Sequence, residues 1–342
     1  MYNFKFKGKD YNMGNILTKE MIEQANENDV VEGYVYLRYL QKTVSAKNVP
    51  YLMGEIETKE KFSIIMWSKC PQYPSLENTK LVNCLVNING VINIYGGKKS
   101  IHLNNITVVD PKVVGVNVDD LKCLRYNKDL YSKCLLNEVN QNLSKKGIDL
   151  FNNIFKPNDA NGIWIRFTFE YAAKNYHDNC ECGLLAHTYK CVRLLKYLLG
   201  PYKYLTNLQT TEIPNKEDIK DLLYLGVILH DIGKVFEMKE GIYVSDSFNS
   251  HRILGLNVIF DHKDEIIKNY NEHWYQALIS IIVGHHNGEG ESERARTLYA
   301  YIVHKIDDME ATFTGIGQIL ETSTLEGVEG VRITWEDSIL SL

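Results

Sequence analysis

The sequence lacks long apolar runs and has few cysteines. No stretch of 18 consecutive apolar residues occurs among its 342 residues, so a transmembrane helix is not expected. Residues 1–5 also lack the apolar segment of a signal peptide. The seven cysteines are an odd number without regular spacing, which is typical of reduced thiols and not of a disulfide framework. We therefore expect a cytoplasmic protein that does not bind membranes.

Charge of one sign is also in little excess. The chain has 38 basic and 43 acidic residues, and its net charge is −5. Residues 1–115 carry a net charge of +3, whereas the remainder carries −8. A strongly basic chain would by itself indicate nucleic-acid binding, and this composition does not. The length, with 44% hydrophobic and 11% aromatic residues, predicts two domains with real cores.

Residues 1–115 are rich in short β-type runs, which turn residues such as Asn89-Gly90 and Gly96-Gly97 separate. The runs span 30–44, 51–57, 62–67, 81–95 and 101–109. Five strands in about 80 residues, with a short helix or loop between the third and the fourth, are typical of an OB-fold barrel.

After Asp110-Pro111 the pattern becomes helical, because leucine and valine recur at three- and four-residue steps. We predict connecting helices over 116–159, an all-α domain over 160–320, and a C-terminal extension over 321–342. The predicted fold class is therefore multidomain α+β, with an N-terminal five-stranded OB-fold β-barrel followed by an all-α domain.

Histidine and aspartate recur at separate points of the helical part. His230-Asp231 ends the apolar run 222–229, and Gly233 and Lys234 follow it. The other members of the set, in chain order, are His187, His251, His285, His286 and Asp307. Imidazole and carboxylate groups are the ligands of first-row divalent metals. The joint pattern therefore predicts one converging metal site and a hydrolase.

Two members of this set lie on apolar helical faces. His187 precedes Val192, Leu195 and Leu198 at helical spacing, and Asp307 lies three residues after His304, so these two share a face. A carboxylate on such a face needs a cation or hydrogen-bond donors to offset its desolvation. Taken singly, each residue is as well explained by a core histidine or a surface charge, and we interpret His102, His262 and His273 in that ordinary way.

The order His, His-Asp, His, His-His, Asp resembles that of HD-domain phosphohydrolases, and several local strings are similar to YhaM-type 3′-to-5′ exoribonucleases. The resemblance extends through the N-terminal part and covers most of the chain. The strings that carry it are 171–177 with 183–188, 230–234, 251–255, 284–288 and 304–311.

The resemblance implies a site with two divalent ions. His187, His230, Asp231 and Asp307 are expected to hold the first ion. Asp231 would bridge to a second ion, which His251 and one or both of His285 and His286 would hold. This set favours Mn²⁺, with Fe²⁺, Co²⁺ or Ni²⁺ as alternatives, over Mg²⁺. Asp231 and Lys234 are then the catalytic candidates, because Lys234 is placed to neutralise a phosphate oxygen.

Two segments near the expected site depart from the family pattern. Tyr176 replaces the first member of a frequent His-His pair, so that His177 is the match, and we expect His177 to line the site. The segment 287–297 lacks the prolines that usually follow the His-His pair. We expect this loop to border the substrate entrance and its Arg294 and Arg296 to contact substrate.

An OB-fold beside such a site predicts a polymer substrate, since these barrels bind single strands with basic groups and stacking aromatics. Tyr34, Tyr36 and Arg38 share one face of the first predicted strand, and Lys98 and Lys99 follow a turn between the last two strands. We predict these five as the strand-binding surface and Trp67 as a core residue. The alternative is that the tyrosines merely cover the barrel.

Three functions are compatible with the sequence. The first, which we favour, is a metal-dependent 3′-to-5′ exonuclease acting on single-stranded RNA, and also on single-stranded DNA, with release of nucleoside monophosphates. The second is an HD phosphohydrolase for a small nucleotide, with the barrel used for assembly into a homo-oligomer. The third is a binding protein whose HD site no longer turns over, and the complete ligand set argues against it. No Gly-Tyr-Pro string follows His286, which argues against a cyclic-dinucleotide enzyme.

Overall fold

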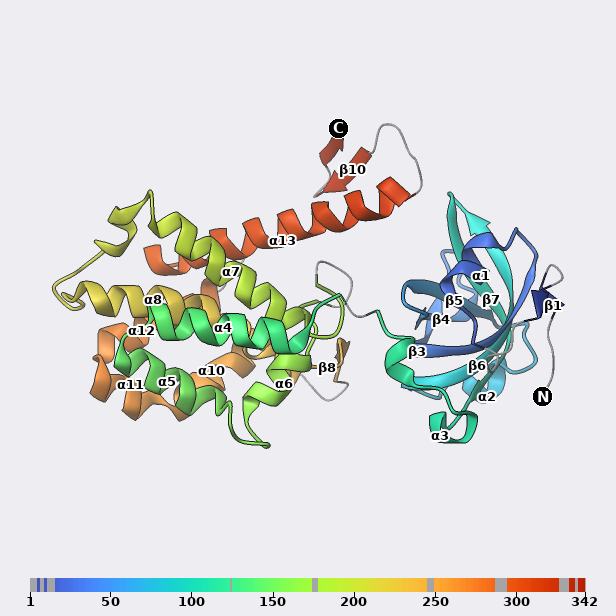
Figure 1. Ribbon diagram of the computed structural model, residues 1–342, viewed down its shortest axis with the longest axis horizontal. Helices are drawn as coiled ribbons and strands as arrows, with labels where there is room; N and C mark the ends of the chain where they lie inside the picture. The colour runs from blue at the N-terminus through green and yellow to red at the C-terminus, as the bar shows by residue number, and fades with distance from the viewer. Residues whose placement is uncertain are drawn as a thin grey trace. The chain divides into compact units, whose positions relative to one another are not determined.

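The computed structural model describes residues 5–6, 9–10, 16–123, 125–173, 178–244, 249–286, 294–325, 332–335 and 338–341. The chain divides into two compact units, Met1–Leu124 and Arg125–Leu342, whose elements are labelled in Figure 1. In the described ranges, no helix is long and apolar enough to cross a membrane.

The first unit is built on five strands that form a closed barrel in the order β3-β4-β5-β7-β6. All neighbouring strands are antiparallel except β5 and β7, which run parallel. This strand order is that of an OB-fold, and the predicted fold is confirmed. Each predicted run matches a strand to within three residues, the bounds being β3 (Val30–Val44), β4 (Pro50–Glu57), β5 (Lys61–Trp67), β6 (Leu81–Tyr95) and β7 (Lys98–Val108).

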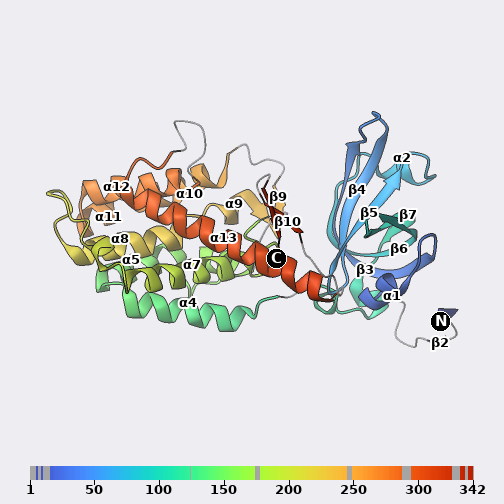
Figure 2. The same cartoon turned by 90° about the horizontal axis from the view of Figure 1, so that it is seen from above.

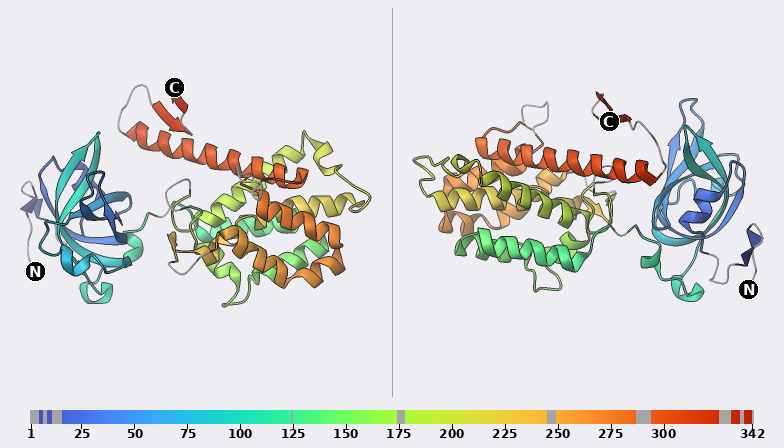
Figure 3. Two further views of the ribbon diagram at one scale, coloured as in Figure 1. Left: turned by 180° about the vertical axis from the view of Figure 1, so that it is seen from behind. Right: turned by 45° about the horizontal axis from the view of Figure 1, so that its top comes forward.

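Alternate apolar side chains of the strands fill the barrel, among them Val35, Ile64 and Ile88, all nearly inaccessible to solvent. The short helix α1 (Lys19–Gln24) packs onto this core through Ile22, and Figure 3 shows it in front of the barrel in the right-hand view. The remaining elements are β1 (Lys5–Phe6), β2 (Lys9–Asp10), α2 (Tyr73–Leu76), α3 (Pro111–Val114) and η1 (Val118–Asp120). The helix α2 lies between the third and fourth barrel strands, as predicted.

Strand β3 is irregular in its middle. Its register with β4 shifts between Leu37 and Tyr39, so Arg38 is the extra residue of a β-bulge, which interrupts the two-residue alternation. Tyr36 packs with Leu85, Val116 and Leu121, because the chain that follows β7 covers this side of the strand. The simple alternation assumed for β3 therefore does not hold beyond Tyr36.

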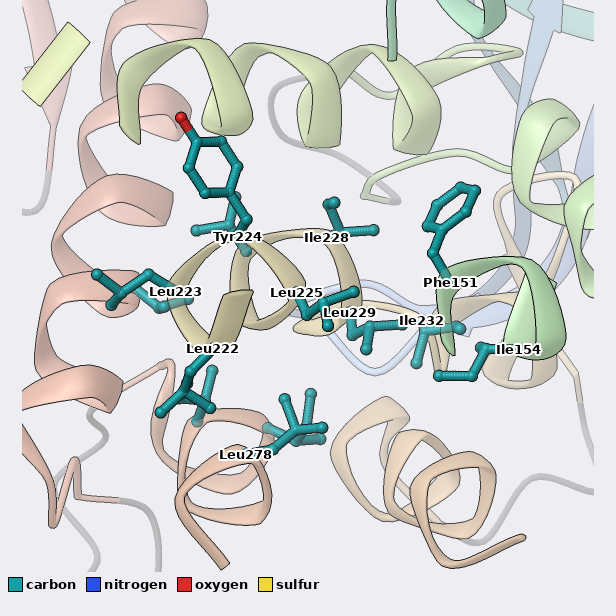
Figure 4. Close-up of a cluster of buried hydrophobic side chains, with 14 of the residues drawn as sticks. Phe151, Ile154, Leu222, Leu223, Tyr224, Leu225, Ile228, Leu229, Ile232 and Leu278 are labelled. Carbon is teal, nitrogen blue, oxygen red and sulfur yellow. The ribbon is translucent and has the colours of Figure 1, made fainter. Parts of the chain in front are cut away.

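The second unit is helical and packs around α8. From Ile219 to Leu229 nearly every α8 side chain is buried, which is typical of a helix with neighbours on all sides. Figure 4 shows α8 side chains pointing in several directions, toward Phe151 and Ile154 of α5 and toward Leu278 of α12. The helices are α4 (Lys128–Asn142), α5 (Lys145–Phe155), α6 (Ile163–Phe169), α7 (Gly183–Leu199), η2 (Lys203–Thr206), α8 (Lys216–Leu229), α9 (Lys234–Glu237), α10 (His251–Asp261), α11 (Lys263–Asn269), α12 (Glu272–Gly284) and α13 (Leu298–Leu325).

Helix α13 is the longest of these and packs on α7, α8 and α12, and the view from above in Figure 2 shows it running along the bundle. Two short hairpins complete the unit: β8 (Met238–Lys239) pairs with β9 (Ile242–Tyr243), and β10 (Arg332–Trp335) pairs with β11 (Ser338–Ser341). Helices α7, α12 and α13, which carry or precede motif residues, all pack against α8.

Helices α4 and α5 occupy the segment that the sequence suggested as a connector, 116–159. Leu135 and Val139 of α4 and Leu150 and Phe155 of α5 belong to the same buried cluster as the residues of α8. The division between the two compact units falls at Leu124 and Arg125. These helices are therefore part of the helical core.

Candidate metal centre

The candidate ligands lie on five helices of the second unit, and most of them lie at helix ends. His230 and Asp231 follow the last residue of α8, and His285 and His286 follow that of α12. His251 is the first residue of α10. His187 and Asp307 lie within α7 and α13. Chain segments up to about 120 residues apart in sequence are thereby brought to one place by helix packing.

Gly233 allows two of these helix ends to approach each other. A side chain at this position would overlap the carbonyl group of His251 and lie 2.5 Å from the Gly255 nitrogen. Glycine is therefore required here by close backbone contact. The Gly-Lys pair after His230-Asp231 thus has a structural reason, which is to bring the start of α10 beside Asp231.

Asp231 stands between two groups of histidines. Its Oδ1 lies 3.5 Å from Nε2 of His251 and 3.5 Å from Nε2 of His285. Its Oδ2 lies 3.4 Å from Nε2 of His230 and 3.8 Å from Nε2 of His187. Each carboxylate oxygen therefore faces a different pair of imidazoles, as a ligand shared by two ions must.

Asp307 and His286 complete the two groups. Asp307 Oδ1 lies 3.2 Å from His187 Nε2 and 3.7 Å from His230 Nε2. His286 Nε2 lies 2.9 Å from His251 Nε2. We call His187, His230, Asp231 and Asp307 the first group, and Asp231, His251, His285 and His286 the second group. The second group has ligand atoms all within 4.8 Å of one another, so the residues predicted as metal ligands do converge.

The tautomers of the imidazoles are set by hydrogen bonds on their outer nitrogens. Nδ1 of His230 donates to the Val227 carbonyl at 2.8 Å, and Nδ1 of His285 donates to the Ile282 carbonyl at 2.9 Å. Nδ1 of His251 donates to Glu237 at 3.1 Å, and Nδ1 of His187 donates to Glu310. Because Nδ1 of each ring donates outward, Nε2 is the nitrogen that faces the centre, as metal-ligating histidines require.

Two buried atoms support the presence of a cation. Asp231 Oδ1 and His285 Nε2 are inaccessible to solvent and have no hydrogen-bond partner among the described residues. A buried acceptor without a partner costs about 1–3 kcal/mol, and more when it is charged. A divalent ion between these acceptors would satisfy both, so the residues fit the metal centre that the sequence predicts.

The pKa values of the ligands agree with this arrangement. Burial raises the pKa of Asp231, but the charges of Lys234 and His230 lower it well below its usual range. Burial opposes ionisation of Asp307 as well, and hydrogen bonds from His187 and His230 hold its pKa well below normal. Both carboxylates are therefore ionised at neutral pH and able to bind cations.

The two sides of the centre differ in imidazole charge. Burial lowers the pKa of His286 to about 3, with help from neighbouring His285, and burial also lowers the pKa of His285. Burial lowers the pKa of His230 too, but Asp231 and Asp307 outweigh it and raise the pKa to about 9. In the metal-free protein, His230 thus carries a proton that a metal ion must displace.

Lys234, the second catalytic candidate, lies beside Asp231. Its Nζ is 2.6 Å from Asp231 Oδ2, and its side chain is largely buried. Burial lowers the pKa of Lys234, yet the Asp231 carboxylate raises it above normal. The ammonium group is therefore charged and fixed at the centre.

Of the other residues predicted at the site, His177 lies outside the described residues. Arg294 and Arg296 are exposed just before α13. His304, which shares a helix face with Asp307, donates from Nδ1 to the His285 carbonyl at 2.7 Å. It therefore supports the backbone that carries the second group.

Three of the five barrel residues predicted for strand binding are placed differently, and those predictions need correction. Tyr36 and Arg38 are each only 3% exposed. Arg38 lies 3.4 Å from the buried carboxylate of Glu57, which offsets its burial in the bulge. Lys99 Nζ donates to the carbonyl of Ile22 in the last turn of helix α1 and, at 2.7 Å, to that of Ala25 just after it, so it stabilises that helix end.

Lys98 remains exposed and Tyr34 is half-buried. Trp67, which the sequence suggested as a core residue, is 38% exposed instead. Its ring lies 5.0 Å from that of Tyr51 on β4 and 5.9 Å from that of His102 on β7. We call Tyr51, Trp67 and His102 the aromatic patch. It was missed because the end of a strand does not reveal whether another segment covers it.

Two neighbours of His187 were also missed. Glu310 accepts a hydrogen bond from His187 Nδ1, and its spacing of three from Asp307 could have indicated a shared helix face. Cys191, one turn after His187, has its Sγ 3.7 Å from His187 Nε2. Burial raises the pKa of this thiol to about 12, so it is neutral at physiological pH.

The first unit is thus an OB-fold barrel, and the helical second unit carries the centre of histidines and aspartates. Residues 184–312 match the family model described as HD domain, and this range contains all seven candidate ligands.

The chain is also similar over most of its length to proteins named 3′-5′ exoribonuclease YhaM, so the resemblance read from the local strings is confirmed. It is 25% identical over 305 residues to the one from Shouchella clausii, and the aligned region covers 86% of this chain and 87% of the relative. It is 24% identical over 307 residues to the one from Bacillus subtilis, which covers 85% and 88%. Among solved structures, the SSB domain of a Synechococcus sp. protein aligns at 11% identity and a TM-score of 0.21, over 24% of this chain and 97% of that domain.

Proposed function

We propose that this protein is a metal-dependent 3′-to-5′ exonuclease that hydrolyses single-stranded RNA to nucleoside monophosphates, with single-stranded DNA as a second substrate. The similarity to the YhaM exoribonucleases supports the reaction and its direction. The observation that carries the proposal is the position of Asp231, whose two oxygens each face a separate pair of imidazole nitrogens.

The first and second groups would each hold one divalent ion. Such ions supply a hydroxide nucleophile at neutral pH and offset negative charge on the phosphate. Imidazole and carboxylate together suit Mn²⁺, Fe²⁺, Co²⁺ or Ni²⁺ better than Mg²⁺, and we propose Mn²⁺.

Residues around the two groups would determine how substrate approaches and how charge on the phosphate is offset. His187, His230 and His285 are fully buried, whereas His286 is exposed and Asp307 partly so, so substrate would approach on the side of His286 and Asp307. Lys234 holds Asp231 in place and is close enough to offset charge on a phosphate oxygen.

For the barrel we propose that single strands bind at the aromatic patch. Exposed aromatic rings accept stacked bases of any sequence, at about 1–3 kcal/mol per base. Ile65 pairs in register with His102 on one side and with Met53 on the other, and these two apolar residues extend the surface beside Trp67. Lys98 and Tyr34 stay candidates for backbone contacts, and the patch takes the place of Tyr36 and Arg38.

The test is incubation of purified protein with Mn²⁺ and 5′-labelled single-stranded RNA, resolved on a sequencing gel. We expect a ladder that shortens from the 3′ end and is absent with Asp231→Asn. Cleavage of circular single-stranded RNA would contradict an exonuclease. Turnover of a small nucleotide or nitrophenyl phosphodiester, with no action on RNA, would instead support a small-molecule phosphohydrolase.

A further inference from the structure

A chain of buried polar groups lies behind the first group, on the side away from the centre. It starts at Glu310 of α13, which accepts a hydrogen bond from His187 Nδ1 through Oε2. The other oxygen, Oε1, lies 2.7 Å from Lys190 Nζ and accepts a hydrogen bond from Thr314. Lys190 belongs to α7, one turn after His187, so a single carboxylate joins α7 to α13 at a metal ligand.

Lys190 is held by more than this carboxylate. Its Nζ donates to Asp178 Oδ2 at 2.8 Å and to Thr314 Oγ1 at 2.8 Å. The hydroxyl of Tyr126 donates to the same Asp178. Asp178 and Glu310 are at least 97% buried, and the one ammonium group lies within ion-pair distance of both. We call Glu310, Lys190, Asp178 and Tyr126 the buried relay.

The relay has a directional effect on His187. Glu310 can accept a proton donated by Nδ1 only if the imidazole ring is turned so that Nε2 faces Asp231 and Asp307. Lys190 Nζ lies 2.7 Å from Oε1 of Glu310, so the carboxylate is paired with a cation and acts as a charged acceptor. A charged acceptor makes the imidazole a stronger electron donor, and Lys190 keeps that acceptor from turning away.

We propose that Glu310 is a positioning residue for the first metal ion and that Lys190, Asp178 and Tyr126 hold it in place. The inference rests on the proposed function only in requiring a metal ion at the first group. Among the described residues, the hydrogen bonds and ion pairs of the relay reach only His187 of the candidate ligands and none of the second group. Its loss should therefore affect one ion and not the other.

The chain contains a matched control for a merely structural role. Glu138 of α4 is 4% exposed and lies 2.6 Å from Lys196 of α7. This pair, like Glu310 and Lys190, joins α7 to another helix through a buried carboxylate. Within the part of the chain that the structure describes, Glu138 and Lys196 form no hydrogen bond or ion pair with a residue of the two metal groups. Substitutions at both pairs thus separate metal positioning from helix packing.

The experiment titrates Mn²⁺ into full-length, chelator-treated protein by calorimetry, with metal content measured after dialysis. Glu310→Gln keeps the size of the side chain and removes its charge. We expect one of two binding events to weaken roughly 10- to 100-fold, with a smaller loss for Lys190→Met and the least for Tyr126→Phe. Glu138→Gln and Lys196→Met should keep both affinities within about twofold of the unchanged protein.

Unchanged affinity for both ions in Glu310→Gln would overturn the inference, as would an equal loss in Glu138→Gln. If Glu310→Gln does not fold by circular dichroism, Tyr126→Phe decides, because it removes only a hydroxyl group. A parent protein that binds no divalent ion would contradict the proposed function itself. A parent that binds two ions, with all relay variants unchanged, would contradict only the role of the relay.

Discussion

Replacing Gly233 with alanine should disturb the second group and leave the first group in place. The added Cβ would lie 2.5 Å from the Gly255 nitrogen and 2.6 Å from the His251 carbonyl carbon. Uncompressed contacts between such atoms begin at roughly 3.5 Å. The carbonyl oxygen of His251 would be closer still, so the start of α10 must move by at least about 1 Å relative to Asp231.

A movement of this size is large for the site, because His251 Nε2 is only 3.5 Å from Asp231 Oδ1. Misplacing a reacting group by about 1 Å costs roughly a hundredfold in rate, and inserting a methyl group into a packed interior costs about 1–3 kcal/mol. We expect kcat to fall about 100-fold, one of two Mn²⁺ ions to bind more weakly, and the free energy of unfolding to fall by about 1–3 kcal/mol.

The assay combines RNA hydrolysis, Mn²⁺ calorimetry and urea unfolding. Gly317→Ala is the control, since a Cβ there would meet no atom within 4 Å. Alanine is favoured over glycine within a helix by about 0.5–1 kcal/mol, so Gly317→Ala should gain stability and keep full activity. The reasoning is refuted if Gly233→Ala binds two ions and hydrolyses RNA within twofold of the parent.

Three further outcomes are expected. Asp231→Asn should lose both ions by metal analysis and reduce hydrolysis by at least about 10³-fold, and retention of one tight ion would contradict a shared ligand. Trp67→Ala should weaken binding of long single-stranded RNA while a nitrophenyl phosphodiester is hydrolysed normally, whereas Lys99→Met, which alters only the end of α1, should spare RNA binding in a filter assay. Mn²⁺ affinity should rise by about tenfold per pH unit for each proton displaced and level off near pH 9. The reason is that the pKa of His230 is raised to about 9, so below that pH its imidazole must lose a proton before it can bind the ion. Constant affinity by calorimetry between pH 6 and pH 9 would show that this proton is not displaced.

The sequence by itself determined the two kinds of fold and which histidines and aspartates to consider as ligands. Alternating apolar runs and turn residues placed the five strands of the barrel to within three residues, since strand formation depends on local patterns. The order of His187, His230-Asp231, His251, His285-His286 and Asp307 likewise indicated one centre. Histidines and aspartates on apolar helices have few other ways to satisfy their polar atoms, and this restriction can be read without coordinates.

Only the tertiary structure decided which side chains are covered and how the ligands are oriented. Tyr36 and Arg38 share a predicted face, but a bulge and the segment containing Val116 bury them. Trp67 lies at a strand end that stays open. In these cases burial depends on segments distant in sequence, so no local period reports it.

The same holds for the buried relay behind His187. Glu310 stands three residues after Asp307 in the sequence, yet its contact with His187 spans 123 positions. Lys190 and Asp178 reach it from two other segments. Local spacing limits which residues can share a metal centre. The packing of α7 against α13 determines which nitrogen of His187 faces the candidate centre and which carboxylate binds the other nitrogen.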